Sequence, residues 1–567
     1  MRTRLVAARP YREVTPAGMT LGILTGIVLT VSFTYTGLVI GFVVPASAVA
    51  AILGWGLLRG VLRRGTIIEN NINQTVAAAI SCSCGGVIFT VPVLMLLGQP
   101  VPYGVLSGAT IVGAALGVLF ILPLRRQMIE LDRLRFPTGT AVAQILRSPG
   151  AGLRKSALLG AGVIASAALS SLIGLPRLWP ALPQLLPETV DLGRLLGLPG
   201  YMSHVWALSA LSLGAGFLSG RAGLVVLLGG VLANWLLSPV LVHLRWAPPD
   251  GTVLFREINR PLGIGMLLGG ALVGVAMAVP LLRGALAGLG RRGGGTSDEL
   301  GLRSFVGAGL VGLLALWGLA QVGSAGLPPG QAALVALVGV VYIALSGIII
   351  AQCTGLTDWS PMSGMALIAV SLIMLLSGHH VAVSVACGAA CCVAMGQAAD
   401  MMTDLKTGHL VGTRPRLQQL AQLSVAWMGP PVALGTLHLV ARAYGLGTDR
   451  VPAPQAQALQ AAMLGLLGGQ APVDRYLAGA LLGGLLTAAL GGGLGVMVGL
   501  SMYIPFQYIL PYGLGCLLAM WAERRLGGRW CQDTGLPLAA GLIVGDSLAG
   551  VTLALLQVGR GLGAVVP

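Results

Sequence analysis

The residues of this chain that could do chemistry are acids and amides set within long apolar stretches. The stretch 69–92, ENNINQTVAAAISCSCGGVIFTVP, opens with Glu69 and four amides and then thins to small residues. An ionised side chain at bilayer depth costs about 2.5 to 3.5 kcal/mol, so a helix with this cluster must face protein or water. We expect it to form one wall of a substrate path. A polar loop followed by an ordinary packing helix is the alternative.

Further acids lie at membrane depth near the C-terminal end of the chain. Asp546, in GLIVGDSLAGV, has apolar residues on both sides. An isolated acid there must pair, titrate or contact a cation, so we expect Asp546 or Glu69 to be a proton-coupling group. Asp400 and Asp404 are four residues apart and share one helical face, where Lys406 or Arg414 could neutralise them. The acid pair with Lys406 is expected to form a gate, and a solvated helix end is the alternative.

The segment TGLTDWSPMSGM, residues 354–365, has the composition of an interrupted helix. Asp358 stands between two apolar runs, with serines and glycines around it and Pro361 soon after. A broken helix exposes backbone groups that can line a cavity, whereas a plain loop is the alternative. Combined with the 69–92 stretch, this gives a predicted substrate-binding set of Tyr35, Asn70, Asn73, Gln74, Thr90, Asp358, Ser360 and Ser363.

Composition shows which elements must position these residues. Of 567 residues, 55% are hydrophobic and 9% are charged, with a mean hydropathy of +0.87. A soluble core cannot bury that much apolar surface, so the fold class is an all-α polytopic membrane bundle. The net charge of +16 comes from arginines in short loops, which positive-inside bias explains better than nucleic-acid binding does.

Motifs of common enzyme classes are missing from the sequence. There is no phosphate-binding loop, no His-Glu-x-x-His and no Gly-x-Ser-x-Gly. We therefore expect neither an ATP-driven pump nor an enzyme, and no cofactor. The eight cysteines follow no CxxC spacing, so neither a disulfide framework nor a metal site is expected. Metal capture by His379 and His380 remains an alternative.

Apolar runs predict 15 to 17 spans, among them 201–219, 222–243 and 476–500. The short run 455–470 and the proline-broken run 501–512 are candidates for re-entrant segments. Arginines precede the first span and follow the second, fourth and eighth, which predicts a cytoplasmic N-terminus.

The chain is expected to consist of two related halves, 1–283 and 303–567, joined by a cytoplasmic linker at 284–302. A weak repeat supports this division: Thr36-Gly37-Leu38 is followed by Pro45 and Ser47, and Thr354-Gly355-Leu356 is followed by Pro361 and Ser363. Internal repeats of this kind build the central site of many secondary transporters.

Several longer stretches resemble the oligopeptide transporter superfamily, in particular its prokaryotic and yellow stripe-like branch. They cover nearly the whole chain: YREVTP at 11–16, TIIENNINQT at 66–75, GVIFTVP at 86–92, LRFPTGTAVAQIL at 134–146, TGLTDWSPMSGM at 354–365, DMMTDLKTGHLVGTRPRLQQLAQL at 400–423 and AAGLIVGDSLAGV at 539–551.

The resemblance implies a duplicated bundle of about sixteen helices that imports small peptides, glutathione-like compounds or metal chelates together with protons. Glu69, Asp400, Asp404 and Asp546 match the family pattern. Ser81, Phe33, Val39 and Gln144 stand where the family usually has charged or strongly polar residues, so no role of those positions carries over.

The sequence thus predicts a proton-coupled importer of small oligopeptides or peptide-like compounds that works by alternating access in the cell (inner or plasma) membrane. Its expected partners are the substrate, protons and the lipid bilayer, and a homodimer is left open. Uptake of a metal chelate is one alternative. A non-transporting membrane scaffold or sensor is the other.

Overall fold

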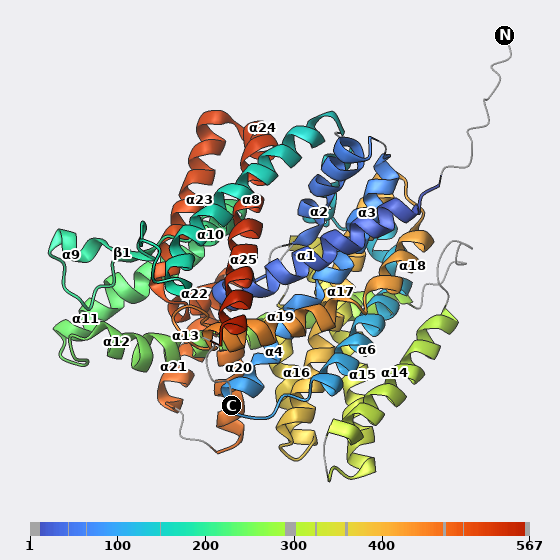
Figure 1. Cartoon of the computed structure of the whole chain (residues 1–567). Coiled ribbons are helices and arrows are strands. Elements are labelled where there is room, and N and C mark those ends of the chain that lie inside the picture. Colours follow the sequence, from blue (N-terminus) through green and yellow to red (C-terminus); the bar gives the residue numbers. More distant parts are fainter. Residues whose placement is uncertain are drawn as a thin grey trace.

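The computed structural model describes residues 12–43, 45–63, 65–147, 149–289, 302–323, 326–357, 361–468, 472–491 and 493–561. These residues form a bundle of helices with one two-stranded antiparallel sheet at its edge (Figure 1). Twelve helical stretches of the described chain are long and apolar enough to cross a membrane, and shorter apolar helices lie among them. The prediction of a polytopic helical bundle is confirmed, whereas a count of about sixteen spans is not.

The first part of the chain contains these elements: α1 (Pro16–Ile40), α2 (Ala46–Trp55), η1 (Gly56–Val61), α3 (Ile67–Ser81), α4 (Ser83–Thr90), α5 (Pro92–Leu96), α6 (Tyr103–Ile121), η2 (Leu122–Leu124), η3 (Arg126–Leu131), α7 (Pro137–Leu146), α8 (Pro149–Leu178), β1 (Thr189–Asp191), α9 (Leu192–Leu196), β2 (Val205–Ala207), α10 (Ala210–Val231), η4 (Leu232–Leu237), α11 (Ser238–His243), α12 (Gly251–Val253), η5 (Leu254–Asn259) and α13 (Arg260–Leu289).

The second part contains only helices: α14 (Leu302–Gly323), α15 (Pro329–Thr357), α16 (Met362–Leu376), α17 (Val381–Val411), α18 (Pro415–Val425), α19 (Gly429–Tyr444), α20 (Pro454–Leu466), α21 (Val473–Leu490), α22 (Leu494–Tyr503), α23 (Phe506–Leu526), α24 (Gly528–Trp530), η6 (Cys531–Gly535) and α25 (Leu536–Gly559). The proposed linker 284–302 overlaps the end of α13 and the start of α14, and residues 290–301 lie outside the described residues. The division into halves stays a prediction.

Local sequence signals explain the ends of the helices that matter most. Thr15 caps α1 by accepting from the Gly18 N–H, and Pro16 supplies the fixed backbone angle of the first turn. Thr66 caps α3 in the same way by accepting from the Glu69 N–H. The long helix α17 ends at Gly412, whose φ of 90° is the left-handed conformation that glycine adopts without strain.

Two helix triplets share one arrangement. In the first triplet α1 runs parallel to the continuous α3–α4 helix, with Gly22 beside Asn73 and Gly26 beside Ala77, and the short helix α2 runs antiparallel to α3. In the second triplet α15 runs parallel to α17, and the short helix α16 runs antiparallel to it.

The two triplets point in opposite directions. Gly86 of α4 lies against the Val393 backbone of α17, while Ala79 of α3 accepts from Gln397. A Cβ on Gly86 would lie 2.5 Å from the Val393 nitrogen, so only glycine lets these two helices touch. Because residue numbers rise along one helix as they fall along the other, α3–α4 and α17 are antiparallel. This is the geometry of an inverted repeat.

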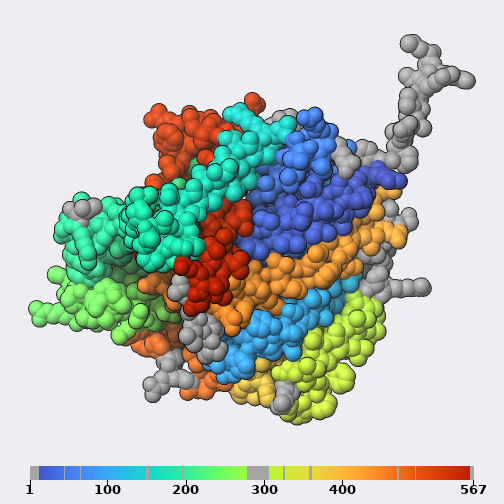
Figure 2. Space-filling view, viewed as in Figure 1, coloured from blue at the N-terminus to red at the C-terminus, as the bar shows by residue number. Residues whose placement is uncertain are grey.

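Other helices enclose these triplets. α8 packs along α25, α10 along α23, and α13 along α21, while α6 packs on α17. Figure 2 shows one closed face, on which α8, α25, α1, α19 and α6 lie side by side although they are far apart in the sequence.

Two predicted spans differ from the observed helices. Residues 201–219 include strand β2 and the start of α10, and α10 continues past a break at Gly220 (φ 52°, ψ −130°). Residues 476–500 form two helices, α21 and α22, which fold against each other around Gly491 and Gly493. In the second case the run of apolar residues is continuous, but Gly491 and Gly493, both with positive φ, break the helix inside it. In the first case a strand and a loop precede the helix, and Gly220 lies at the boundary between the predicted spans 201–219 and 222–243.

Candidate functional site

A central chamber of about 440 Å³ lies between the two triplets. Helix breaks make up much of its wall. It is lined by Phe33, Gly41, Phe42, Val43, Pro45, Ala46, Ser47, Ser81, Cys82, Gly85, Phe89, Thr138, Ser219, Ala222, Gly223, Val226, Thr354, Met362, Ser363, Gly396, Ala399, Asp400, Thr403, Gln455, Val496, Met497, Leu500 and Tyr512. We call this cavity the central chamber.

Each triplet contributes the break between its first and second helix. α1 ends at Gly41, whose φ is 78°, and Pro45 precedes α2. In the second triplet α15 ends at Thr357, and Pro361 precedes α16. The weak repeat seen in the sequence marks these two breaks. Irregular backbone at membrane depth is tolerated where it lines a cavity, and the first break lines the central chamber. Thr354, Met362 and Ser363, on either side of the second break, line it too.

The acid pair of α17 lies at the chamber. Asp400 lines it and makes no hydrogen bond or ion pair with another described residue; its Oδ2 is buried without a partner. Asp404, one turn further on, is fully buried; its Oδ1 accepts from the Ser47 hydroxyl at 3.4 Å, and its Oδ2 has no partner among the described residues. A half-buried and a fully buried carboxylate without a paired cation attract a proton or another cation strongly.

The basic residues that the sequence suggested as partners lie elsewhere. The Cβ of Lys406 faces Gly139 of α7, where an added Cβ would lie 3.4 Å from it. Arg414 lies 3.4 Å from Glu13 and donates to it through its backbone as well. The acid pair therefore has no basic partner within the described part of the chain.

The amides at the start of α3 hold helices together and do not line the central chamber. Asn70 and Asn73 donate to the backbone oxygens of Ala51 and Ala50 in α2, at 3.0 and 3.4 Å. Gln74 donates to Asn71 and Thr75. All three side chains are fully buried, and oxygens of Asn73 and Gln74 have no partner among the described residues.

A set of glutamines extends this network to α17 and α18. Gln418 donates to Thr75 and to the Asp404 backbone oxygen, and Gln397 donates to Ala79 and Ser83. Gln422 in turn donates to the Gln397 Oε1 at 2.9 Å. Sequence reasoning missed these residues. Gln418 and Gln422 stand four residues apart in α18 (PRLQQLAQLSV) and therefore on one helical face, which is a signal that could have indicated a buried amide contact.

Asp546 and Tyr35 meet in a separate cavity of about 80 Å³. Asp546 accepts from the Ser170 hydroxyl at 2.5 Å and from the Leu211 N–H, in the first turn of α10, at 2.7 Å. Tyr35 packs edge-on against Tyr444 with ring centres 6.4 Å apart. Both carboxylate oxygens of Asp546 are thus satisfied by protein donors, unlike those of Asp400.

The remaining predicted residues divide between buried contacts and the chamber. The Thr15 hydroxyl donates to Glu69 at 2.5 Å, and Thr90 donates to the Gly86 backbone oxygen. Neither residue lines the central chamber, whereas Ser363 does. Asp358 and Ser360 lie outside the described residues.

Sulfur and imidazole groups are spread along the structure. Cys82 lines the chamber, and Cys84 is fully buried beside it in α4. His379 and His380 precede α17, whose chamber-lining part begins about 22 Å further along the helix at Gly396. Among the described residues no three His, Cys, Asp or Glu side chains come close enough to hold a metal ion.

Comparison with known proteins agrees with this architecture. Residues 13–557 match the family model of the OPT oligopeptide transporter protein. A Haemophilus influenzae protein named as a candidate oligopeptide transporter is 26% identical, with 92% of each chain covered. Two plant proteins are named as candidate metal-nicotianamine transporters. The one from Arabidopsis thaliana is 29% identical, over 36% of this chain and 33% of its own length. The one from Oryza sativa is 25% identical, over 78% of this chain and 72% of its own length. The resemblance seen in the sequence is confirmed, and the chain belongs to the OPT oligopeptide transporter family.

Proposed function

We propose that this transporter imports small peptides or peptide-like compounds together with protons, and that Asp400 and Asp404 carry the coupling proton. The observation that carries the proposal is Asp400 on the wall of the central chamber, with the fully buried Asp404 one helical turn behind it. A carboxylate without a hydrogen-bond donor or basic partner at this depth gains most from taking up a proton. Protonation also neutralises the carboxylate, so no net charge has to be moved when the chamber closes on one side of the membrane and opens on the other.

This assignment differs from the roles that the sequence suggested. Glu69 and Asp546 were the predicted coupling groups, and the α17 acids were a predicted gate. Thr15 satisfies Glu69, and Ser170 with Leu211 satisfies Asp546, so both acids are better suited to holding helices in place. We therefore propose coupling for the α17 pair and a structural role for Asp546 and Glu69.

The substrate would occupy the central chamber, whose wall is mixed in character. Ser47, Ser363, Thr354 and Gln455 offer hydroxyls and an amide, while Phe42 and other apolar residues cover the remaining wall. A few polar groups on an apolar wall are typical of small-molecule sites. Hydrogen bonds to backbone-like amides of a short peptide are consistent with this wall.

Charge distribution supports a cytoplasmic N-terminus in a cell membrane. The end of the bundle where α1 begins also carries Arg59, Arg147, Arg414 and Arg416, and Arg147 donates to Leu410 there. The opposite end mixes Arg177 and Arg450 with Glu188, which lies within 4 Å of both. Positive-inside bias assigns the basic end to the cytoplasm. The homodimer stays a prediction.

The experiment is uptake of a labelled dipeptide into proteoliposomes that contain the purified protein under an imposed pH gradient. We expect accumulation that requires the gradient and disappears when a protonophore collapses it. Liposomes with the Asp400→Asn protein are the matched control. Gradient-independent uptake by the unaltered protein would reject proton coupling, and no uptake of any peptide would reject the substrate class.

Uptake of a metal chelate is the second candidate function. Two observations favour it: plant relatives bear names of metal-nicotianamine transport, and the Cys82 thiol faces the chamber. In the same vesicles, a nicotianamine complex of iron that competes with the dipeptide would support a shared site. A complex that is accumulated when dipeptides are not would make the chelate the substrate.

A further inference from the structure

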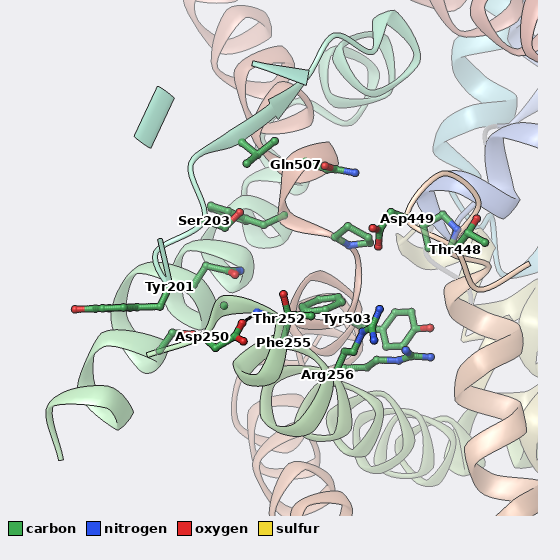
Figure 3. Close-up of a pocket in the computed structure, with 18 of the residues that line it drawn as sticks. Tyr201, Ser203, Asp250, Thr252, Phe255, Arg256, Thr448, Asp449, Tyr503 and Gln507 are labelled. Carbon is green, nitrogen blue, oxygen red and sulfur yellow. Dashed lines mark hydrogen bonds between the residues drawn. The ribbon is translucent and has the colours of Figure 1, made fainter. Parts of the chain in front are cut away.

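A second cavity, larger than the central chamber, lies away from the N-terminal ends of α1 and α3. It measures about 590 Å³ and is enclosed by the 200–205 segment, η5, the 447–452 loop and the joint between α22 and α23. Figure 3 shows its polar lining, which includes Tyr201, Asp250, Arg256 and Asp449. We call it the vestibule.

Charges of both signs face the vestibule without pairing. Asp250 and Asp449 supply two negative charges, and Arg256 and Arg260 supply two positive ones. None of the four forms an ion pair with a described residue. In Figure 3 the two acids lie on opposite sides of the cavity, and Arg256 lies at its lower edge, below Asp449. Separated charges of opposite sign match a ligand that carries an ammonium and a carboxylate.

Two of the four charged side chains are held by their own surroundings. Asp250 caps α12 by accepting from the Thr252 N–H at 2.8 Å. The Arg260 guanidinium lies 5.2 Å above the ring of Tyr503, a contact that orients it without neutralising its charge. Preformed geometry of this kind lowers the entropic cost of binding a ligand.

A buried amide adds an unused hydrogen-bond acceptor to the wall. Gln457 lines the vestibule and is 4% exposed; its Nε2 donates to the Pro452 oxygen at 2.6 Å. Its Oε1 has no partner within the described residues. An unpaired buried acceptor is unfavourable, and a ligand N–H or a water molecule would supply the missing donor. This atom points to a ligand with a nitrogen donor.

The segment 452–457 separates the vestibule from the central chamber. Pro452 and Gln457 line the vestibule, whereas Gln455 lines the chamber. The Ala453 N–H donates to the Leu38 oxygen at 2.8 Å, and Gln455 donates to the Gly41 oxygen at 3.1 Å, so the segment is fastened to the break after α1. A ligand in the vestibule is one short segment away from the chamber.

We propose that the vestibule is a second ligand site, which binds a zwitterionic, peptide-like molecule before it enters the central chamber. Arg256 and Arg260 receive the carboxylate, while Asp449 and the Gln457 oxygen receive the ammonium and an amide N–H. A cavity of 300 to 1,000 Å³ is usual for small-molecule sites, and this one falls within that range. The chemical class of the ligand rests on the proposed function; the two-site arrangement does not.

The first test compares uptake by the unaltered protein with uptake by Arg256→Gln and Asp449→Asn proteins, with labelled Ala-Ala as the probe. We expect the half-saturating concentration to rise about tenfold in each variant, with little change in maximal rate, because one charge-assisted contact is lost. Arg194→Gln is the control, since this arginine is 90% exposed on the nearby α9 and pairs with Asp191. Unchanged half-saturation in both variants would overturn the proposal.

The second test does not depend on transport. Equilibrium binding of labelled Ala-Ala to the detergent-solubilised chain is expected to show two sites, of which Arg256→Gln removes one and Asp400→Asn does not remove that one. N-acetyl-Ala-Ala-amide lacks both charges, so it is expected to bind at one site, the central chamber, and not in the vestibule. A single site in the unaltered protein overturns the vestibule proposal even if uptake occurs. Two sites without uptake support it and reject the proposed function.

Discussion

Two regions of the molecule hold an acid at membrane depth, and their surroundings are opposite. On α25, Asp546 accepts one hydrogen bond from Ser170 and one from the first turn of α10, in a cavity of about 80 Å³. On α17, Asp400 lines a chamber of about 440 Å³ and has no partner among the described residues. An aspartate side chain thus joins helices through two hydrogen bonds in one region, whereas in the other region an aspartate has no hydrogen-bond donor.

The difference shows that an acid at membrane depth does not by itself indicate a proton-coupling group. A carboxylate that receives two donors, one of them at a helix N-terminus, fixes the helices that provide the donors. A carboxylate that faces a chamber without donors gains most from binding a proton or a cation. We therefore attribute stability to the α25 region and coupling to the α17 region.

The largest effect is expected when the α17 acids lose their charge. In the Asp400→Asn, Asp404→Asn double variant, gradient-driven accumulation of a dipeptide should fall to the level of protein-free vesicles. Exchange of substrate between the two sides should persist, because asparagine resembles a protonated aspartate in shape. Counterflow and net uptake measured on one vesicle preparation separate the two activities. Full accumulation in the double variant would contradict the assignment of proton coupling to the α17 region.

A second effect should distinguish two neighbouring cysteines, Cys82 between α3 and α4 and Cys84 in α4. Cys82 lines the central chamber, while Cys84 is fully buried, so a small water-soluble thiol reagent should label only the former. Single-cysteine proteins that retain either residue provide the comparison, and mass spectrometry gives the labelled fraction. Equal labelling of both would show that the chamber wall is not where the geometry puts it.

Much of this architecture could be predicted from the sequence, because hydropathy reports lipid exposure over some twenty residues at a time. The helical class, the family and the break before Pro361 follow from such local patterns, whereas the break before Pro45 was not predicted. Helix breaks caused by glycine are harder to foresee: the positive φ of Gly491 and Gly493 depends on tertiary contacts, whereas the predicted span 476–500 passes through both residues.

The partners of polar residues could not be predicted at all. Asn70 bonds to a residue 19 positions away, Asp546 to residues 335 and 376 positions away, and the sequence contains no signal for either pairing. Sequence reasoning treated the amides of α3 as substrate ligands because lipid excludes them. The structure has them buried between helices, which excludes lipid equally well.

A moderate loss of stability is expected when the α25 region loses the carboxylate of Asp546. Asp546→Ala should lower the free energy of unfolding by about 3 kcal/mol, because the Ser170 hydroxyl and the Leu211 N–H both lose their acceptor. Thermal unfolding in detergent measures the loss. Asp546→Asn keeps one acceptor oxygen and should unfold between the two. An Asp546→Ala protein as stable as the unaltered one would remove the structural role assigned to this acid.

The smallest effect concerns the glutamines that join α3, α17 and α18. Gln397→Leu should cost about 1 to 2 kcal/mol of stability, since Gln422 and Ser83 lose a partner while the apolar side chain still fills the space. The ratio of protons to substrate should stay constant. A changed ratio without a loss of stability would place Gln397 in the coupling machinery with the acids.

The most direct test of the account is to count protons. Vesicles that hold a pH-sensitive dye and receive labelled dipeptide report proton and substrate fluxes together, and the ratio can be compared for the unaltered, Asp400→Asn and Asp546→Asn proteins. We expect dipeptide-induced proton flux to vanish in Asp400→Asn and to keep its normal ratio in Asp546→Asn. Loss of proton flux in Asp546→Asn with a normal ratio in Asp400→Asn would contradict the account.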